Sequence, residues 1–159
     1  MALTRDFVAS VMEPYLAGDF EGFVRQKCTP DFTYDLVPGD IASKLGLTGP
    51  AQQHEFAGIF KGHDAAVKMI LEGLTGREVK DLKIGARVLK TVVDVEDRSA
   101  ALEVELFGDA KRTDKPFILA NAIFLTFDEN LKITYWSDHL DTFTLAKLAG
   151  VEELEPELP

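Results

Sequence analysis

A strand near the end of the chain carries the side chains best suited to chemistry. Residues Ile133–Leu140 begin with β-branched and aromatic side chains that favour a pleated sheet. Because strand side chains alternate between faces, Asp138 shares one face with Trp136 and Leu140, whereas His139 lies on the other. A carboxylate on the same face as a tryptophan and a leucine lies either on a solvated rim or in a mostly apolar pocket. In the pocket, loss of solvent would raise its pKa and suit it to proton transfer.

A second candidate acid, Asp35, stands at the end of a predicted strand, just before Pro38-Gly39. It is either a pocket acid or a turn cap for that Pro-Gly pair. If Asp35 and Asp138 met on facing strands, they would repel each other, and one would be ionised while the other stayed protonated near neutral pH. Such a pair suits proton removal beside a carbonyl, or epoxide opening by a base-activated water, and it needs no cofactor.

Other reactive residue types lack a supporting pattern. The three histidines, His54, His63 and His139, have no metal-binding spacing, so we expect no metal site. His63 can cap a helix or reach a pocket, and His54 falls in a long loop. The single cysteine, Cys28, excludes an intrachain disulfide and a cysteine-rich metal site. No serine or cysteine has the context of a catalytic nucleophile, and the sequence 46–49 lacks the lysine of a phosphate-binding loop.

The amino-acid composition disfavours two classes of binding partner, nucleic acids and membranes. The 159 residues contain 17 Lys and Arg against 27 Asp and Glu, for a net charge of -10. This negative field disfavours nucleic acid and anionic membrane surfaces. The N-terminus turns acidic too soon for a signal peptide, and no apolar run is long enough to cross a bilayer. We therefore expect a cytoplasmic protein with one domain over residues 1–150 and an acidic tail over residues 151–159.

Hydrophobic spacing predicts helices first and strands afterwards. Thr4 caps a first helix, in which Pro14 predicts a kink or an early end, and Asp19 caps a second. A third helix starts near Phe60, after an irregular stretch with one helical turn around Ala51–Ile59. The predicted strands are Asp31–Val37, Val79–Val95, Ala100–Phe107, Phe117–Phe127 and Ile133–Leu140, with a last helical turn over Phe143–Leu148. This order predicts an α+β fold, in which a curved antiparallel sheet wraps around three N-terminal helices to form a cone with a pocket at its open end.

This order of elements carries a family resemblance. Gly-Asp joins the first two helices, Phe-x-Gly-His-Asp-Ala opens the third, and Phe-Asp-x-x-x-Lys-Ile precedes the last strand. From about Leu3 to Leu148 the chain resembles the nuclear transport factor 2-like superfamily. Within it, the chain is most similar to SnoaL-like polyketide cyclases, steroid Δ5-3-keto isomerases and limonene-epoxide hydrolases. The superfamily hosts many reactions and also binders without catalytic activity.

The resemblance implies a set of site residues. The stretch Phe32–Gly39 is similar to the isomerase strand that holds the proton-shuttling base, which falls on Asp35. Trp136-Ser137-Asp138 is similar to the epoxide-hydrolase Trp-x-Asp, which falls on Asp138. The predicted pocket residues are Tyr15, Phe60, His63, Asn121, Trp136 and Leu140.

The chain also departs from both patterns. The epoxide-hydrolase Arg is missing around Glu103-Val104-Glu105, where the glutamates form either a solvated face or, for Glu105, a pocket wall. Ile123 stands where the isomerases have a buried acid, although Asn121 could donate a hydrogen bond in its place. The isomerases' first-helix tyrosine corresponds to Val11, with Tyr15 one turn further along the same face. The chain thus resembles both enzymes without matching either site.

Two hypotheses follow. The first is a cofactor-independent enzyme that uses acid/base catalysis on a hydrophobic, oxygenated small molecule, such as a polyketide, terpenoid or steroid-like compound. The reaction would be a cyclisation, an isomerisation or an epoxide opening. The alternative is a non-catalytic binder of an apolar ligand, or a dimerisation module. In either case Ile118, Ala122 and Phe124 need cover on the outer face of their strand, which predicts a homodimer.

Overall fold

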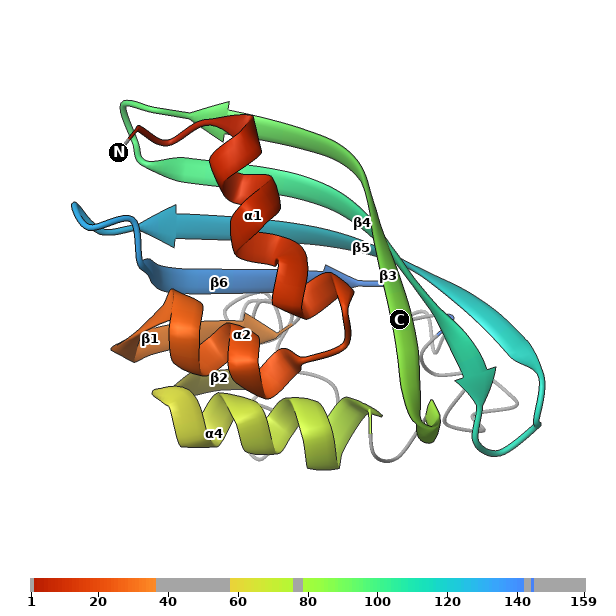
Figure 1. Ribbon diagram of the computed structural model, residues 1–159. Coiled ribbons are helices and arrows are strands. Elements are labelled where there is room, and N and C mark those ends of the chain that lie inside the picture. Colours follow the sequence, from red (N-terminus) through yellow and green to blue (C-terminus); the bar gives the residue numbers. More distant parts are fainter. Residues whose placement is uncertain (1, 37–57, 76–78, 142–143, 145–159) are drawn as a thin grey trace, which may run out of the picture.

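One six-stranded sheet, covered on one face by helices, forms the body of the protein in a computed structural model (Figure 1). The structure describes residues 2–36, 58–75, 79–141 and 144. Along the sheet the strands follow the order β2-β1-β6-β5-β4-β3. Their bounds are Cys28–Leu36 for β1, Gly58–Lys61 for β2, Val79–Asp94 for β3, Ser99–Ala110 for β4, Pro116–Phe127 for β5 and Ile133–Leu140 for β6. The predicted α+β fold, with its curved sheet and three helices ahead of the long strands, is confirmed.

The first two helices form as their caps predict. Helix α1 (Arg5–Leu16) begins where the Thr4 hydroxyl accepts a hydrogen bond from the Phe7 amide, and α2 (Phe20–Lys27) begins where Asp19 accepts one from the Gly22 amide. Pro14 does not end α1, which runs on to Leu16. The two helices bury one apolar stripe, which consists of Val8, Val11, Met12, Tyr15, Phe20, Phe23 and Val24.

The segment that precedes β3 differs from the prediction. Phe60 and Lys61 belong to strand β2, and the third helix, α4, starts only at His63 and runs to Lys68. A wider π-helical segment, η2 (Met69–Thr75), follows it. Strand β2 forms because it pairs antiparallel with β1, a long-range contact that local hydrophobic spacing does not reveal.

Two predicted helical turns fall largely outside the described residues. Of the turn expected around Ala51–Ile59, residues 51–57 are not described, and the last two residues, Gly58 and Ile59, begin strand β2 instead. Of the turn expected over Phe143–Leu148, the structure describes Thr144 alone.

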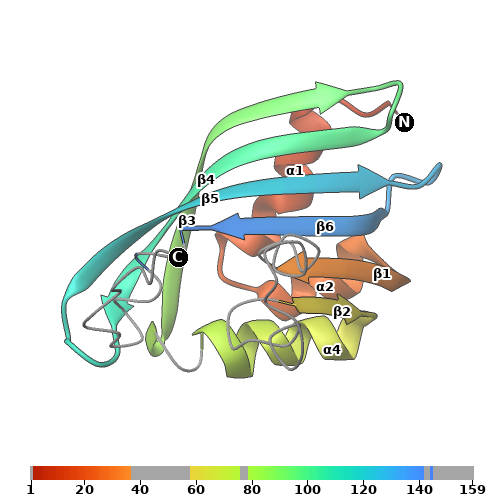
Figure 2. The same ribbon diagram turned by 180° about the vertical axis from the view of Figure 1, so that it is seen from behind.

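The four long strands pair antiparallel as expected, whereas one further pair of strands is parallel. Strands β3 to β6 are antiparallel neighbours, whereas β1 lies parallel to β6. The sheet is therefore mixed at this one junction, which brings the strand after α2 beside the last described strand. Register shifts in β3 between Val79 and Ile84 and between Val88 and Lys90 accompany the bend of the sheet seen in Figures 1 and 2.

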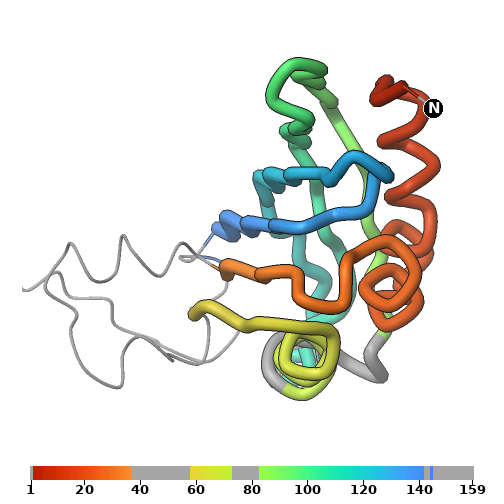
Figure 3. The backbone as a smooth tube through the Cα atoms, turned by 90° about the vertical axis from the view of Figure 1, so that its left-hand side faces the viewer, coloured from red at the N-terminus to blue at the C-terminus, as the bar shows by residue number. Residues whose placement is uncertain are grey.

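The two faces of the sheet differ in burial. The inner face, toward α1 and α2, buries alternate residues of each strand, such as Leu102 and Val104 of β4 and Ile123 and Leu125 of β5. In Figure 3 both helices lie on this side of the strands. The outer face exposes large apolar side chains, including Ile118 (61%) and Phe124 (46%). The predicted division of β5 into a core-facing and an outer row is confirmed.

The predicted solvated glutamates of β4 are also found on the outer face. Glu103 is exposed, and Glu105 forms an ion pair with Arg87 of β3. Glu105 is therefore not a pocket wall on the helix side of the sheet. Among the described residues, no helix is long and apolar enough to cross a membrane.

Candidate active site

Asp138 lies on the inner face of β6, in the layer between the sheet and the helices. Alternation along β6 places Trp136 and Leu140 on the same face, and the strand register sets Asp138 between Ile123 of β5 and Leu36 of β1. The side chain is 3% exposed. The sequence therefore predicted the orientation of Asp138 correctly, and the structure places it in an apolar layer rather than on a rim.

Tyr34 is the direct partner of this carboxylate. Its hydroxyl donates a hydrogen bond to Oδ2 of Asp138 over 3.1 Å, and both side chains are buried. In the register between β1 and β6, Tyr34 pairs with Trp136 and Leu36 pairs with Asp138, so Tyr34 lies two residues away from Asp138 on the neighbouring strand. Tyr34 was not predicted as a site residue from the sequence. Its inward orientation could have been predicted, because strand alternation places Phe32, Tyr34 and Leu36 on the same, core-facing side of β1.

Burial controls the protonation of the cluster. It raises the pKa of Asp138 from an ordinary value of 3.8 to about 7, while nearby polar groups on Asn121 and Tyr34 oppose the rise. Burial, and then the negative charge of Asp138, raise the pKa values of Tyr15 and Tyr34 well above 10. Both tyrosines therefore stay protonated, whereas Asp138 can change its protonation state near neutral pH.

Several polar atoms in this layer have no partner. The second carboxylate oxygen of Asp138, both amide atoms of Asn121 and the indole nitrogen of Trp136 are buried and make no hydrogen bond to any described residue. Asn121 lies diagonally across from Asp138, since it pairs with Leu140 in the register between β5 and β6. It is close enough to favour the ionised carboxylate, but it does not reach hydrogen-bond geometry. Unpartnered buried polar groups are rare, and a catalytic role is one of the established reasons for them.

Aromatic rings frame the carboxylate. The ring of Trp136 lies 4.4 Å from that of Tyr34, 5.3 Å from that of Phe23 and 5.8 Å from that of Tyr15. Phe60 of β2 extends this frame, with its ring 6.1 Å from that of Tyr34. Of the predicted pocket residues, Tyr15, Asn121, Trp136 and Leu140 are buried on the same side of the sheet as Asp138, and Phe60 contacts this group through Tyr34.

Asp35 does not join Asp138, so the condition for a pair of facing carboxylates is not met. Tyr34 turns inward, and the next residue must therefore turn outward. Asp35 accepts a hydrogen bond from the Tyr135 hydroxyl over 2.8 Å, and Tyr135 belongs to the outward row of β6. Asp35 is nevertheless only 5% exposed. The inner-face neighbour that β1 supplies to Asp138 is a phenol, not a second acid.

The two described histidines, His63 and His139, also lie apart from Asp138. The ring of His63 has Nε2 3.3 Å from the carbonyl oxygen of Cys28 and packs beside Phe32, so the expected pocket role of His63 is not supported. His139 lies on the outer face as predicted, where its Nε2 is 2.8 Å from the Ser137 hydroxyl. His54 lies outside the described residues. Among the residues that are described, no three side chains of the metal-binding types come together.

Similarity to known proteins is visible in structure only. The sequence matches no protein-family model and no curated protein. An NTF2-like protein of unknown function from Burkholderia pseudomallei K96243 superposes with a TM-score of 0.65 and 17% identity, over 90% of this chain and 94% of that one. A candidate SnoaL-like polyketide cyclase from Jannaschia sp. CCS1 gives 0.64 and 10%, over 89% of each chain.

A third likeness comes from a structure that holds a small ligand. A hypothetical protein with a ketosteroid isomerase-like fold from Catenulispora acidiphila DSM 44928, in complex with trimethylamine, gives a TM-score of 0.58 and 14% identity, over 85% of each chain. At such identities these likenesses show the fold alone. The chain has the fold of the nuclear transport factor 2-like superfamily, as its element order indicated.

Proposed function

We propose that this nuclear transport factor 2-like chain is an enzyme in which Asp138 moves a proton on a hydrophobic, oxygenated small molecule. The observation that carries the proposal is the state of Asp138. It is buried among aromatic side chains, its pKa is raised to about 7, and one of its oxygens has no partner among the described residues. A general base is most effective when its pKa lies near the working pH, because both protonation states are then populated.

The favoured reaction is proton transfer beside a carbonyl group. In the first step the ionised Asp138 takes a proton from the carbon next to the carbonyl. The electron pair of that C–H bond forms a carbon–carbon double bond to the carbonyl carbon, and the π pair of the carbonyl moves onto its oxygen. Asn121 and Trp136 have buried N–H groups without described partners, which could donate to that oxygen as its negative charge develops. In the second step Asp138 returns the proton to a different carbon. Tyr34 holds the carboxylate by its other oxygen throughout.

Isomerisation, or a cyclisation that starts from the same enolate, fits better than epoxide opening. Epoxide opening with an acid and a separate base needs two titrating groups beside the substrate. Of the buried carboxylates that the structure describes, Asp35 and Asp138, only Asp138 lies on the inner face. The aromatic frame of Trp136, Tyr34 and Phe60 supports a largely apolar substrate.

Exchange of carbon-bound hydrogen tests this proposal without knowledge of the natural substrate. The protein is incubated in D₂O with a panel of hydrophobic ketones, and loss of the proton signal beside the carbonyl is followed by NMR. We expect at least one ketone to exchange faster than in buffer, and Asp138→Asn to lower that rate by roughly 100- to 10,000-fold. Asp109→Asn, which alters an exposed carboxylate on β4, is the matched control and should exchange normally. Equal rates in wild type and Asp138→Asn would contradict the proposal.

The alternative of a non-catalytic module has one observation in its favour, the exposed apolar outer face. We propose that this face forms a homodimer, with or without catalysis. Ile118 and Phe124 of β5 are exposed, and Phe107, the register partner of Ile118 on β4, is 42% exposed. Light scattering should give twice the mass of one chain, and the double variant Ile118→Lys and Phe124→Lys should halve it. Val95→Lys, at an exposed position beyond the end of β3, is the control. A monomeric wild type would refute the dimer.

A further inference from the structure

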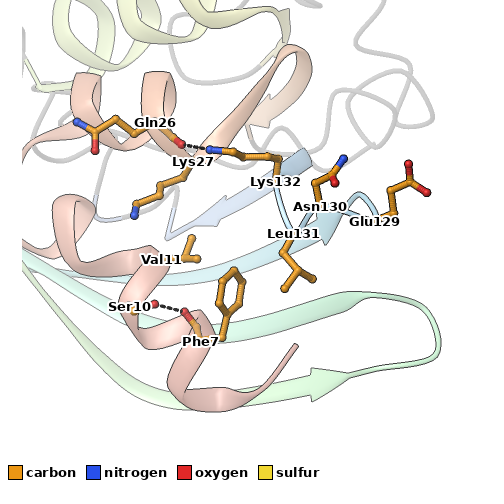
Figure 4. A pocket seen from close by; sticks show the side chains of 9 residues that line it. All are labelled: Phe7, Ser10, Val11, Gln26, Lys27, Glu129, Asn130, Leu131 and Lys132. Carbon is orange, nitrogen blue, oxygen red and sulfur yellow. Dashed lines mark hydrogen bonds between the residues drawn. The ribbon is translucent and has the colours of Figure 1, made fainter. Parts of the chain in front are cut away.

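A pocket lies on the helix side of the molecule, and Asp138 is not among the residues that line it. It has a volume of about 430 Å³ and lies between α1, the last turn of α2 and the loop that joins β5 to β6 (Figure 4). Phe7, Val11 and Leu131 give it an apolar floor, and Lys27, Lys132 and Glu129 carry its charges. None of its lining residues belongs to the Asp138 cluster, so this site is independent of the proposed function.

The loop fixes the apolar side of this pocket at an energetic cost. Leu131 has a φ of 60°, in the left-handed region that glycine and asparagine favour and that a bulky side chain rarely adopts. Asp128 holds the loop in this shape, because its Oδ1 accepts hydrogen bonds from the Asn130 amide over 2.9 Å and the Lys132 amide over 2.7 Å. On the opposite side, the ring of Phe7 packs edge-on against Phe127. Strain that is held in place at the edge of a pocket is typical of a binding site.

The charges of this pocket do not cancel. Lys132 donates to the carbonyl oxygen of Gln26 over 2.5 Å, and this bond satisfies the exposed end of α2. Lys27 lies beside it in the last turn of α2 and makes no hydrogen bond or ion pair with any described residue. Glu129 is the one acidic residue among those that line the pocket. The pocket thus has a net positive charge on a chain whose total is -10.

We propose that this pocket binds a small organic acid, with its apolar body against Phe7, Val11 and Leu131 and its carboxylate beside Lys27. The apolar floor and the ammonium group select together for an amphiphilic anion. A free inorganic anion would leave the floor uncovered, and a neutral apolar molecule would leave Lys27 without a partner. The volume suits a compact molecule with one ring or a short chain.

Amide chemical-shift titrations of the full chain, with two probes of equal shape, test this assignment. The probes are 3-phenylpropanoate and its neutral counterpart 3-phenylpropan-1-ol. We expect the acid to shift the amides of α1, of Lys27 and of Glu129–Lys132, and to bind at least about fivefold more tightly than the alcohol. Equal binding of both probes, or shifts centred on other residues, would overturn the proposal.

Charge variants at the rim sharpen the test. Lys27→Gln should weaken binding of 3-phenylpropanoate by roughly three- to tenfold, and Glu129→Gln should strengthen it about threefold. Lys68→Gln is the matched control, because Lys68 also lies in the last turn of a helix, α4, and does not line the pocket. It should bind the acid like the wild type. Unchanged binding in both Lys27→Gln and Glu129→Gln, or a loss in Lys68→Gln equal to that in Lys27→Gln, would refute the site.

Discussion

The two faces of strand β6 carry similar polar residue types, but these differ in how completely their hydrogen bonds are satisfied. On the outer face the polar groups are matched: the Tyr135 hydroxyl donates to Asp35, and Ser137 lies within hydrogen-bond distance of His139. On the inner face Asp138 has one bond, from Tyr34, and an oxygen without a described partner. The amide of Asn121 and the indole nitrogen of Trp136 share this condition.

This difference separates a structural polar group from a candidate functional one. A buried carboxylate whose lone pairs are satisfied contributes to one stable arrangement of the sheet. A buried carboxylate that is desolvated and only partly bonded costs stability, because its charge is not compensated. Destabilising groups of this kind are found mainly at functional sites. We therefore expect the proton transfer to take place on the inner face. Matching substitutions on the two faces of the sheet therefore test this difference.

The largest expected difference is between the two aspartates in turnover. Asp138→Asn keeps the shape but removes the proton-transferring group, and it should lower turnover by roughly 100- to 10,000-fold. Asp35→Asn should keep turnover within about threefold of wild type, because its carboxylate faces Tyr135 on the other side of the sheet. Steady-state rates on any ketone that the exchange assay identifies provide the measurement. A large loss in Asp35→Asn alone would reverse the assignment of the two faces.

The next difference appears in folding stability as a function of pH. Between about pH 4 and pH 7 the unfolded chain ionises Asp138, whereas the folded chain keeps it protonated. The folded state therefore binds more protons, and this carboxyl lowers the free energy of unfolding of the wild type as the pH rises through that window. Asp138→Asn lacks this loss, so its stability relative to wild type should increase by a few kcal/mol between pH 4 and pH 7 and then level off. Urea unfolding at four pH values measures it.

The same experiment has an internal control on the outer face. Asp35→Asn replaces a carboxylate that accepts a hydrogen bond from Tyr135, and it is measured in parallel as the matched substitution on that face. A stability difference between Asp138→Asn and wild type that is constant from pH 4 to pH 8 would mean that Asp138 titrates like an ordinary surface acid.

A smaller effect is expected from the tyrosine partners. Tyr34→Phe removes the hydrogen bond that favours ionised Asp138, so the pKa of Asp138 and the lower limb of the pH–rate profile should move upward by roughly one pH unit. Tyr135→Phe removes the equivalent bond to Asp35 and should leave that limb in place. Each variant should lose about 1 kcal/mol of stability, so a shift in only one of them separates the electrostatic role from the structural one.

The fold was largely predictable because its long strands and capped helices have strong local signals. Thr4 and Asp19 cap α1 and α2 as expected, and β6 has its predicted bounds. Strand β2 and the parallel pairing of β1 with β6 were not predicted. Both depend on contacts between segments that lie far apart in the sequence, which hydrophobic periodicity does not record.

The site was predicted only in part for a related reason. Alternation within one strand is a local property, and it oriented Asp138, Trp136 and Leu140 correctly. The partner of Asp138 depends on which strand lies beside β6 and in what register. A similarity to the isomerase strand selected Asp35, whereas the register turns Tyr34 toward the carboxylate. A shift of one residue along β1 exchanges the side chain on the inner face, so the partner of Asp138 is the phenol of Tyr34 and not the acid of Asp35.

The titration of Asp138 on the inner face can be measured directly by NMR. The carboxyl carbons of the aspartates are labelled with carbon-13, and their chemical shifts are followed from pH 3 to pH 9, with Asp138→Asn to assign the signal. We expect a midpoint of about 7 for Asp138, because burial raises its pKa from an ordinary value of 3.8. A midpoint below about 5 would contradict the role proposed for Asp138, since a carboxylate of ordinary acidity is not the desolvated group that the proton transfer requires.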